Sequence, residues 1–194
     1  RTLLADKIVL DASLTLGLPP HVTAATGIDA MVHAIEAYTS RRLKNSLSDM
    51  LAREALSLLA GNIVVAVKQG DNLDARGSML LGAMLAGQAF ANAPVAAVHA
   101  LAYPLGGNYH IPHGLSNSLV LPHVIRFNGP SAGDLYKEIA PLIMPGKSLP
   151  DDALVVTEML AEHFLSLAED LGLQTSLSQM NVPEGDLPKL AEEA

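Results

Sequence analysis

The chain has 194 residues, of which 49% are hydrophobic, and twelve basic against twenty acidic residues give a formal net charge of −8. A mean hydropathy of +0.30 excludes a disordered chain, and the acidic balance without a basic stripe argues against a nucleic-acid partner. The absence of cysteine excludes disulfides, thiolate metal sites and a cysteine nucleophile, and it fits a cytoplasmic protein.

No segment predicts a membrane role. The opening residues, RTLLADKIVLD, contain no apolar stretch long enough for a signal peptide. The most apolar region, 79–107, is dense in glycine and alanine and is interrupted by polar residues. A membrane span needs about 20 predominantly apolar residues, so this region is interpreted as buried helices of a soluble domain. An interaction surface in this region is the alternative.

The first half of the chain predicts helices after a short extended start. Residues 7–11, KIVLD, predict a lone strand or an extended segment, and the two prolines in 16–20 predict a turn. Thr23 is a suitable N-cap for a helix that ends near Ser40. The sequence SLSD at 46–49 offers a second cap, for a helix that ends near Lys68.

The next elements are separated by glycine and proline. A helix over 75–91 follows the break GDNLD, and Pro94 is expected in the first turn of another helix. That helix, VAAVHALAY, is expected to stop at Pro104, which leaves NYHIPHG as a loop.

Further helices are predicted over 115–127, with a kink or break at Pro122, over 132–143, and over 151–171, ended by Gly172. Residues 182–188 are expected to cap a last helical piece. The pattern predicts an all-α bundle of some seven to nine helices, with at most a short strand at the N-terminus. The sequence contains no glycine-rich phosphate loop of the GxGxxG or GxxxxGK[ST] kind.

Two polar residues in the stretch TGIDAMVHAIE raise the question of metal binding. Asp29 and His33 are spaced i, i+4, so their side chains emerge on one helix face, one turn apart. This spacing allows one helix to hold two ligands of one ion, as the histidines of HExxH do. A hydrogen bond between the two residues on a partly buried face is the alternative.

Two more histidines, His99 and His113, lie on other segments. Each alone is weak evidence, because a histidine on an apolar helix face is more often a core residue. Together with Asp29 and His33 they make one carboxylate and three imidazoles, which suit a divalent ion such as Fe²⁺ or Zn²⁺. The remaining histidines are less persuasive ligands: His21, His110, His123 and His163.

Two long segments then carry a family resemblance. The first contains Asp11 and Pro19 and continues through TAATGIDAMVHAIEAY, and the second is VHALAYPLGGNYHIPHGLSNSLVLPHVIRFN at 98–128. The chain resembles the helical C-terminal domain of the iron-containing (group III) alcohol dehydrogenases, of the dehydroquinate synthase-like superfamily. The resemblance covers essentially the whole chain and is firmest over 11–128.

The resemblance implies the site residues. The metal ligands of the family match Asp29, His33, His99 and His113. Where members of the family often carry a histidine near substrate and nicotinamide, this chain has Tyr103. A phenol, with an ordinary pKa near 10, is a poor base at neutral pH but can donate or relay a proton. His110 is the second residue considered for the proton path.

The resemblance also implies a division of the protein. Residues 1–20 would connect to a missing N-terminal α/β domain, and residues 21–194 would form the all-helical metal-binding domain, truncated at its C-terminus. NAD or NADP would bind in the cleft between the two domains, so no residue of this chain is assigned to the dinucleotide. The fragment is expected to be inactive alone, and the family allows a homodimer.

The implied function is metal-assisted hydride transfer between an alcohol and an aldehyde or ketone, as part of an NAD(P)-dependent alcohol dehydrogenase. A hydroxyacid–oxoacid transhydrogenase is the alternative on the same scaffold. A maleylacetate reductase-like activity is disfavoured, because such relatives tend to lack the acidic ligand that Asp29 supplies. A non-enzymatic helical metal-binding bundle is the alternative from another class.

Overall fold

The computed structural model describes residues 5–94 and 96–194, and in these residues the fold is all-α, as predicted. The elements in chain order are η1 (Ala12–Thr15), α1 (Pro20–Tyr38), α2 (Ser46–Lys68), α3 (Leu73–Asn92), α4 (Ala97–Tyr109), α5 (His113–Ile143), α6 (Ala153–Asp170), η2 (Ser178–Met180), η3 (Glu184–Asp186) and α7 (Leu187–Glu192). The described residues contain no strand. Residues 7–11 are exposed and irregular, and Asp11 caps η1 by accepting from the backbone N–H of Ser13.

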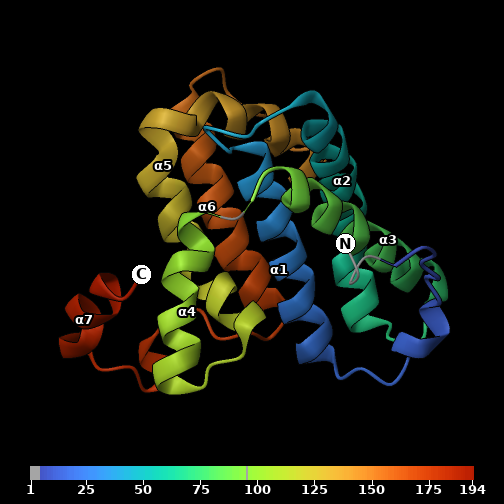
Figure 1. Cartoon of the computed structure of the whole chain (residues 1–194), viewed down its shortest axis with the longest axis horizontal. Helices are drawn as coiled ribbons and strands as arrows, with labels where there is room; N and C mark the ends of the chain where they lie inside the picture. Colours follow the sequence, from blue (N-terminus) through green and yellow to red (C-terminus); the bar gives the residue numbers. More distant parts are fainter. Residues whose placement is uncertain (1–4, 95) are drawn as a thin grey trace.

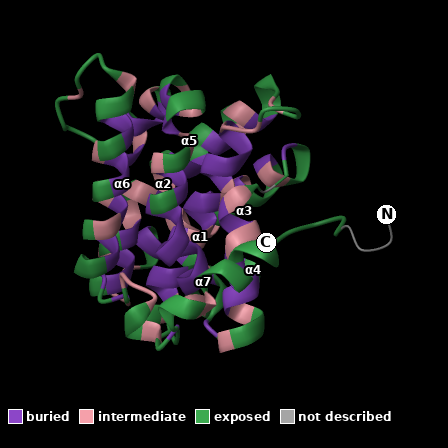
Figure 2. Ribbon diagram, turned by 90° about the vertical axis from the view of Figure 1, so that its left-hand side faces the viewer, coloured by how far each residue is buried: buried purple, intermediate pink, exposed green. Residues whose placement is uncertain are grey.

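Helix α1 is the centre of the bundle (Figure 1). It packs against α2 and α3 on one side and against α5 on another, while α4 and α6 pack against α5 and α7 touches α4. Buried residues fill the middle of the molecule, and exposed residues lie on its outer turns (Figure 2). The central helix therefore contacts both groups of helices.

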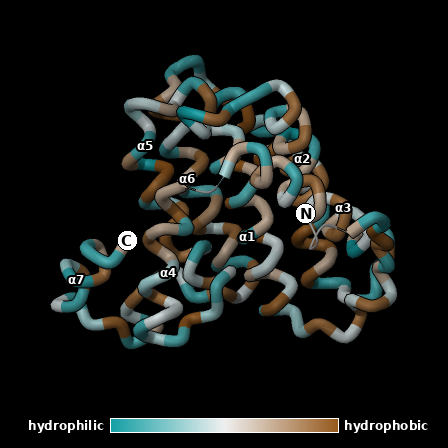
Figure 3. Tube along the Cα trace, in the orientation of Figure 1, coloured by the Kyte–Doolittle hydropathy of each residue, from teal (hydrophilic) through white to brown (hydrophobic). Residues whose placement is uncertain are grey.

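The core is built from small and aliphatic side chains. On α1, Ala24, Ala34 and Ala37 are fully buried, and Leu59 and Ile63 of α2 are equally enclosed. Alanine favours helix and lets helix axes approach closely, which suits a chain with 4% aromatic residues. Hydrophilic residues are most evident on α7 and the outer turns (Figure 3).

Helix α1 begins earlier than the sequence predicts. Pro19 is the N-cap and Pro20 the first helical residue, so Thr23 lies within the first turn instead of capping it. The first helical position tolerates proline, because its backbone N–H would have no helical partner there anyway. The prolines therefore start this helix, and the Thr23 cap was wrong.

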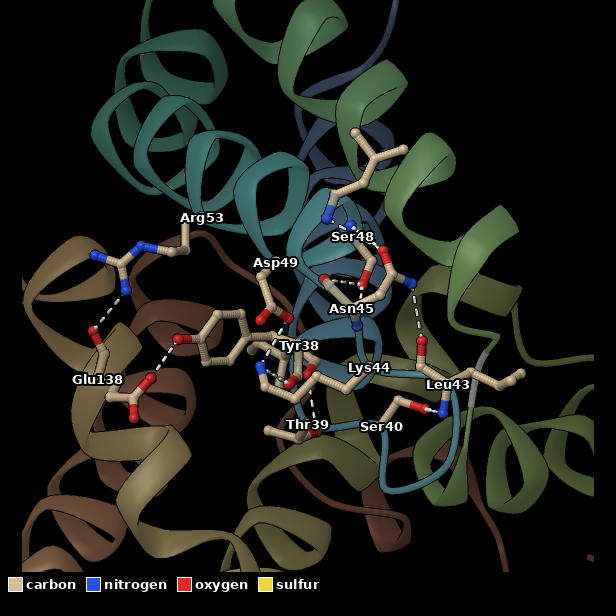
Figure 4. Close-up of polar contacts among 12 residues, drawn as sticks. Tyr38, Thr39, Ser40, Leu43, Lys44, Asn45, Ser48, Asp49, Arg53 and Glu138 are labelled. Atoms are coloured by element: carbon tan, nitrogen blue, oxygen red, sulfur yellow. Dashed lines mark hydrogen bonds and ion pairs between the residues drawn. The ribbon is translucent and has the colours of Figure 1, made fainter.

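A polar network fixes the connection between α1 and α2 (Figure 4). Asn45, not Ser46, is the N-cap of α2 and forms a capping box with Ser48. The Lys44 ammonium donates to the Asp49 carboxylate and to the Tyr38 carbonyl, each at 2.7 Å. The Tyr38 hydroxyl donates in turn to Glu138, which ties this connection to α5.

Prolines interrupt the predicted helices less than expected. Helix α4 continues through the buried Pro104 to Tyr109, so the predicted loop shrinks to His110–Pro112. Pro94 precedes α4 and does not lie in its first turn, while Val95, where the prediction begins this helix, lies outside the described residues.

The two helices predicted over 115–127 and 132–143 are one. Helix α5 runs for 31 residues with Pro122, Pro130 and Pro141 inside it. An interior proline costs about 3 kcal/mol through a lost hydrogen bond and a steric clash. All nine residues from Gly114 to Pro122 are buried, and this packing offsets the local cost.

Helix α2 is long and apolar enough, by length and composition, to cross a membrane. The core helix of a globular domain passes the same test, and α2 packs against α1, α3 and α5. Its buried residues, among them Leu56, Leu59 and Ile63, therefore pack inside the bundle.

Candidate metal centre

Three of the four predicted ligands converge at one point. Asp29 comes from α1, His99 from α4 and His113 from the first position of α5. One ligand atom from each lies within 4.8 Å of the others. A carboxylate and two imidazoles at this separation can hold a divalent cation.

The Asp29 carboxylate is the common neighbour. Its Oδ1 lies 3.7 Å from Nδ1 of His33, 3.7 Å from Nε2 of His99 and 3.6 Å from Nε2 of His113. These separations exceed ordinary hydrogen-bond lengths. The four predicted residues thus lie around one point, and these atoms make no direct hydrogen bonds to one another.

His33 lies beside the cluster and outside the mutually close set. Its Nδ1 is 2.8 Å from the backbone carbonyl of Asp29, one turn earlier. A carbonyl only accepts, so Nδ1 carries the proton and Nε2 keeps its lone pair in the neutral ring. The ring centroids of His33 and His99 are 4.4 Å apart, and Phe90 contacts the His33 ring at 5.3 Å.

His99 turns an unprotonated ring nitrogen toward the Asp29 carboxylate. Its Nδ1 is 2.7 Å from the Glu36 carboxylate, which can only accept, so this nitrogen carries the proton. Its Nε2 is buried without a hydrogen-bond partner, 3.7 Å from Asp29. Two acceptors thus face each other, and burying unpaired polar atoms is costly. A cation between them relieves this arrangement, so the residues fit a metal ion.

Close backbone packing places His113. A Cβ at Gly114 would lie 2.5 Å from the carbonyl oxygen of Ala25, so only glycine lets the first turn of α5 lie directly on α1. His110, at φ 55°, ends α4 in the left-handed conformation, and the chain then turns into α5. These two positions bring His113 within reach of Asp29.

Sequence reasoning missed two residues of the site. Glu36, one turn beyond His33, holds His99, and Asn117, one turn beyond His113, donates to Asp29 Oδ1. Asn117 Nδ2 also lies 3.2 Å from Nε2 of His113, and its Oδ1 is buried without a partner. Both continue the i, i+3 or i, i+4 spacing from a predicted ligand, which was the available signal.

The two predicted proton-path residues are placed differently. The Tyr103 ring stacks on the His113 ring, with centroids 6.0 Å apart and an interplanar angle of 20°, and its side chain is largely exposed. His110 is exposed at the end of α4 and makes no described ring contact with the cluster. Tyr103 is therefore the one that the fold brings to the site.

A pocket of about 410 Å³ opens beside the cluster. Asp29 and His113 lie on its wall, and α1, the first turn of α5 and the loop after α6 supply the rest. Its lining is His21, Val22, Ala25, Thr26, Asp29, Pro112, His113, Gly114, Leu115, Gly172, Leu173 and Gln174. The mainly apolar wall leaves room for a small organic molecule at the cluster.

The helical fold and the Asp–His cluster together describe an all-α domain with a candidate cation site, and comparison with known proteins identifies its family. The model of the Fe-containing alcohol dehydrogenase family, C-terminal, matches residues 23–194. The chain belongs to this family of oxidoreductases, which confirms the resemblance.

Individual relatives agree. The 1,3-propanediol dehydrogenase of Citrobacter freundii is 40% identical over 185 residues, which cover 95% of this chain and 47% of that protein. A crystal structure of a 1,3-propanediol oxidoreductase matches with a TM-score of 0.89 at 40% identity, over 94% of this chain and 47% of the other.

The sulfoacetaldehyde reductase of Bifidobacterium kashiwanohense, solved in complex with NAD⁺, matches with a TM-score of 0.82 at 28% identity, over 94% of this chain and 46% of the other. The chain thus spans about half the length of the curated relatives it matches.

Proposed function

We propose that this chain is the metal-binding part of an NAD(P)-dependent alcohol dehydrogenase that acts on small alcohols and aldehydes. The observation that carries the proposal is the buried, unpartnered Nε2 of His99, which faces the Asp29 carboxylate and His113. Membership of the iron-containing family supports Fe²⁺ as the ion, and Zn²⁺ accepts the same ligands.

Four residues would hold the ion: Asp29, His33, His99 and His113. Asp29 offsets one of its charges, and the three imidazoles bind as neutral groups. His33 would join through Nε2, because its Nδ1 donates to the Asp29 carbonyl. The centre keeps a net positive charge, which favours an electron-rich oxygen of the substrate.

When bound, the metal ion supplies a Lewis acid for the substrate oxygen, and the nicotinamide accepts or donates the hydride. The chain's own residues orient the substrate and handle its proton. We assign to Tyr103, which stacks on His113 and is open to solvent, the role of donating or relaying a proton at the substrate oxygen. The apolar wall of the neighbouring pocket excludes water from the carbon that reacts.

The relatives and the pocket support a substrate class. Matches named for 1,3-propanediol and sulfoacetaldehyde support a short-chain alcohol or aldehyde, which a pocket of about 410 Å³ accommodates. The dinucleotide would bind mainly to the part of the longer enzyme that this chain does not include. A cytoplasmic location and a homodimer complete the proposal.

Metal content per chain is the first test. The wild-type chain, loaded anaerobically with Fe²⁺ or Zn²⁺ and dialysed, should retain one ion, and His113→Gln should lose it. His113 is nearly half exposed, so its replacement leaves the core intact. His123→Gln, at an exposed position of the same helix, is the matched control and should retain the ion.

Equal metal content in both variants would refute the assigned centre. The activity is tested separately, in the longer enzyme that contains this chain. The metal-loaded enzyme should oxidise 1,3-propanediol with NAD⁺ or NADP⁺, measured as nicotinamide absorbance. Stoichiometric metal without hydride transfer to either cofactor would favour a metal-binding bundle without this activity.

A further inference from the structure

Glu36 is a buried carboxylate whose three hydrogen bonds all cross from α1 to α4. Only 4% of the residue is exposed. Oε2 accepts from the backbone N–H of Ala96 at 2.9 Å and lies 2.7 Å from Nδ1 of His99, while Oε1 accepts from the N–H of Val98 at 2.7 Å. Burial of a carboxylate is costly unless donors satisfy it, and these three donors do so.

Helix α4 needs this carboxylate because its own N-cap lacks a suitable side chain. The N-cap is Ala96, which makes no side-chain capping bond. Glu36, sixty residues earlier in the sequence, supplies the missing acceptor to the N–H groups of Ala96 and Val98. Its negative charge also lies at the end of the helix where the backbone dipole favours an anion.

The same carboxylate decides which nitrogen of His99 faces the site. With the Nδ1 proton held by Glu36, the neutral ring has its lone pair on Nε2, the atom that lies 3.7 Å from Asp29. The opposite tautomer would point an N–H at the centre and could not bind a cation. A single side chain therefore sets both the start of α4 and the tautomer of its histidine.

We propose that Glu36 is the positioning residue for His99: it caps α4 from α1, fixes the Nδ1–H tautomer, and thereby sets the metal affinity of the centre. This inference rests on the proposed metal centre and adds a residue outside its four ligands. Groups that orient a ligating histidine typically change metal affinity about 10- to 100-fold when they are replaced.

The tautomer is measured first, in the metal-free chain. Long-range ¹H–¹⁵N correlation of labelled histidine rings should show His99 with its proton on Nδ1 and an unprotonated Nε2, with the resonance assigned from His99→Gln. A proton on Nε2 of the wild-type ring would overturn the proposal. This measurement requires neither metal nor a variant of Glu36.

Metal affinity is measured next, by competition of Zn²⁺ with a chelator. Glu36→Gln should bind about 10- to 100-fold more weakly than the wild type, because an amide nitrogen accepts no hydrogen bond and would lose one contact in place of Oε1 or two in place of Oε2. The pocket beside Glu36, of about 750 Å³, leaves room for the amide. Glu138→Gln is the matched control. It removes a carboxylate of α5 that bonds Tyr38, a residue on the same helix as Glu36, and the Zn²⁺ affinity of this variant should stay within about twofold of the wild type.

The outcomes separate the two proposals. Wild-type affinity in Glu36→Gln, with an unchanged His99 tautomer, would overturn the role of Glu36. If Glu36→Gln does not fold, Glu36→Asp keeps the charge but shortens the reach, and the same loss of affinity is expected. A wild-type chain that binds no Zn²⁺ would refute the metal centre itself, and the tautomer of His99 would then decide the role of Glu36 alone.

Discussion

His163 on α6 is a residue whose environment makes stability depend on pH. Burial, and to a smaller extent the nearby Lys147 charge, lowers the pKa of His163 below its ordinary value of 6.5. The unfolded chain therefore binds a proton at a pH where the folded chain does not. The contribution of His163 to the free energy of unfolding is fully present above pH 6.5 and is lost as the pH decreases below it.

The expected result is a free energy of unfolding that declines from pH 6.5 toward pH 5 in the wild type and declines less in His163→Gln. Urea titrations at several pH values measure it. His123→Gln, which removes an exposed histidine, should follow the wild-type curve. Parallel curves for all three proteins would show that His163 is not responsible.

Single residues of the site differed in how well the sequence predicted them. The i, i+4 spacing of Asp29 and His33 is by itself enough to place both on one helix face. Glu36 follows on the same helix, yet its role depends on His99, 63 positions later. A local pattern cannot reveal that partner, because the approach of α4 to α1 is a tertiary property.

The elements show why proline misled the prediction. Proline disfavours helix locally, and the expected boundaries at Pro104 and Pro122 follow from that preference. Pro104 of α4 and Pro122 of α5 are buried, and the packing of their neighbours outweighs the local cost. The bounds of α2 and α6 were predicted closely, and each helix follows a side chain that caps it, Asn45 and Asp152, which are local signals that the prediction did not use.

Two glycine substitutions, one in the contact between α5 and α1 and one on the exposed face of α2, are expected to have opposite effects on stability. Gly114→Ala would place a methyl group 2.5 Å from the Ala25 carbonyl oxygen, and overpacking of this kind costs about 1–3 kcal/mol. Gly61→Ala, on the exposed face of α2 with no atom within 4 Å of the new Cβ, should stabilise by about 0.5–1 kcal/mol.

Chemical denaturation of both variants beside the wild type measures the difference. Gly114→Ala should also bind metal more weakly, because α1 and α5 must separate and His113 moves with α5. If Gly114→Ala is as stable as Gly61→Ala, α5 does not rest on the backbone of α1.

For the whole molecule, the site joins three helices that are distant in sequence. Its residues come from α1, α4 and α5, so an ion bound there links the centre of the bundle to two other helices. A ligand that binds only the folded chain stabilises it by about 2.7 kcal/mol at 100 times its dissociation constant. In a domain of this size that corresponds to a rise in melting temperature of about 5–10 °C.

Thermal unfolding followed by circular dichroism, with and without Zn²⁺, tests this expectation. The rise should disappear on addition of EDTA and should be absent in Asp29→Asn, which keeps the shape of the side chain but not its charge. The same rise in Asp29→Asn as in the wild type would mean that the ion binds elsewhere.

The fold class of the whole chain was predictable, because composition and helical periodicity are summed over many residues. The arrangement of the helices, with α1 at the centre and α5 continuous, was not predictable, since it depends on contacts between distant segments. Residue type and spacing had singled out the four predicted ligands, and the resemblance matched each of them to a ligand of the family. The structure added the approach of Asp29, His99 and His113, and the partners that orient them.

The direct contact of Gly114 with the Ala25 main chain has a consequence for engineering. The distance between the Asp29 wall and the His113 wall is fixed where the two backbones touch, without an intervening side chain that could change in size. Substitutions along the pocket can therefore alter which molecule is accepted while this spacing is kept. Gln174, exposed on the pocket wall and outside that contact, is the position where a library of variants can search for new substrates without resetting the metal geometry.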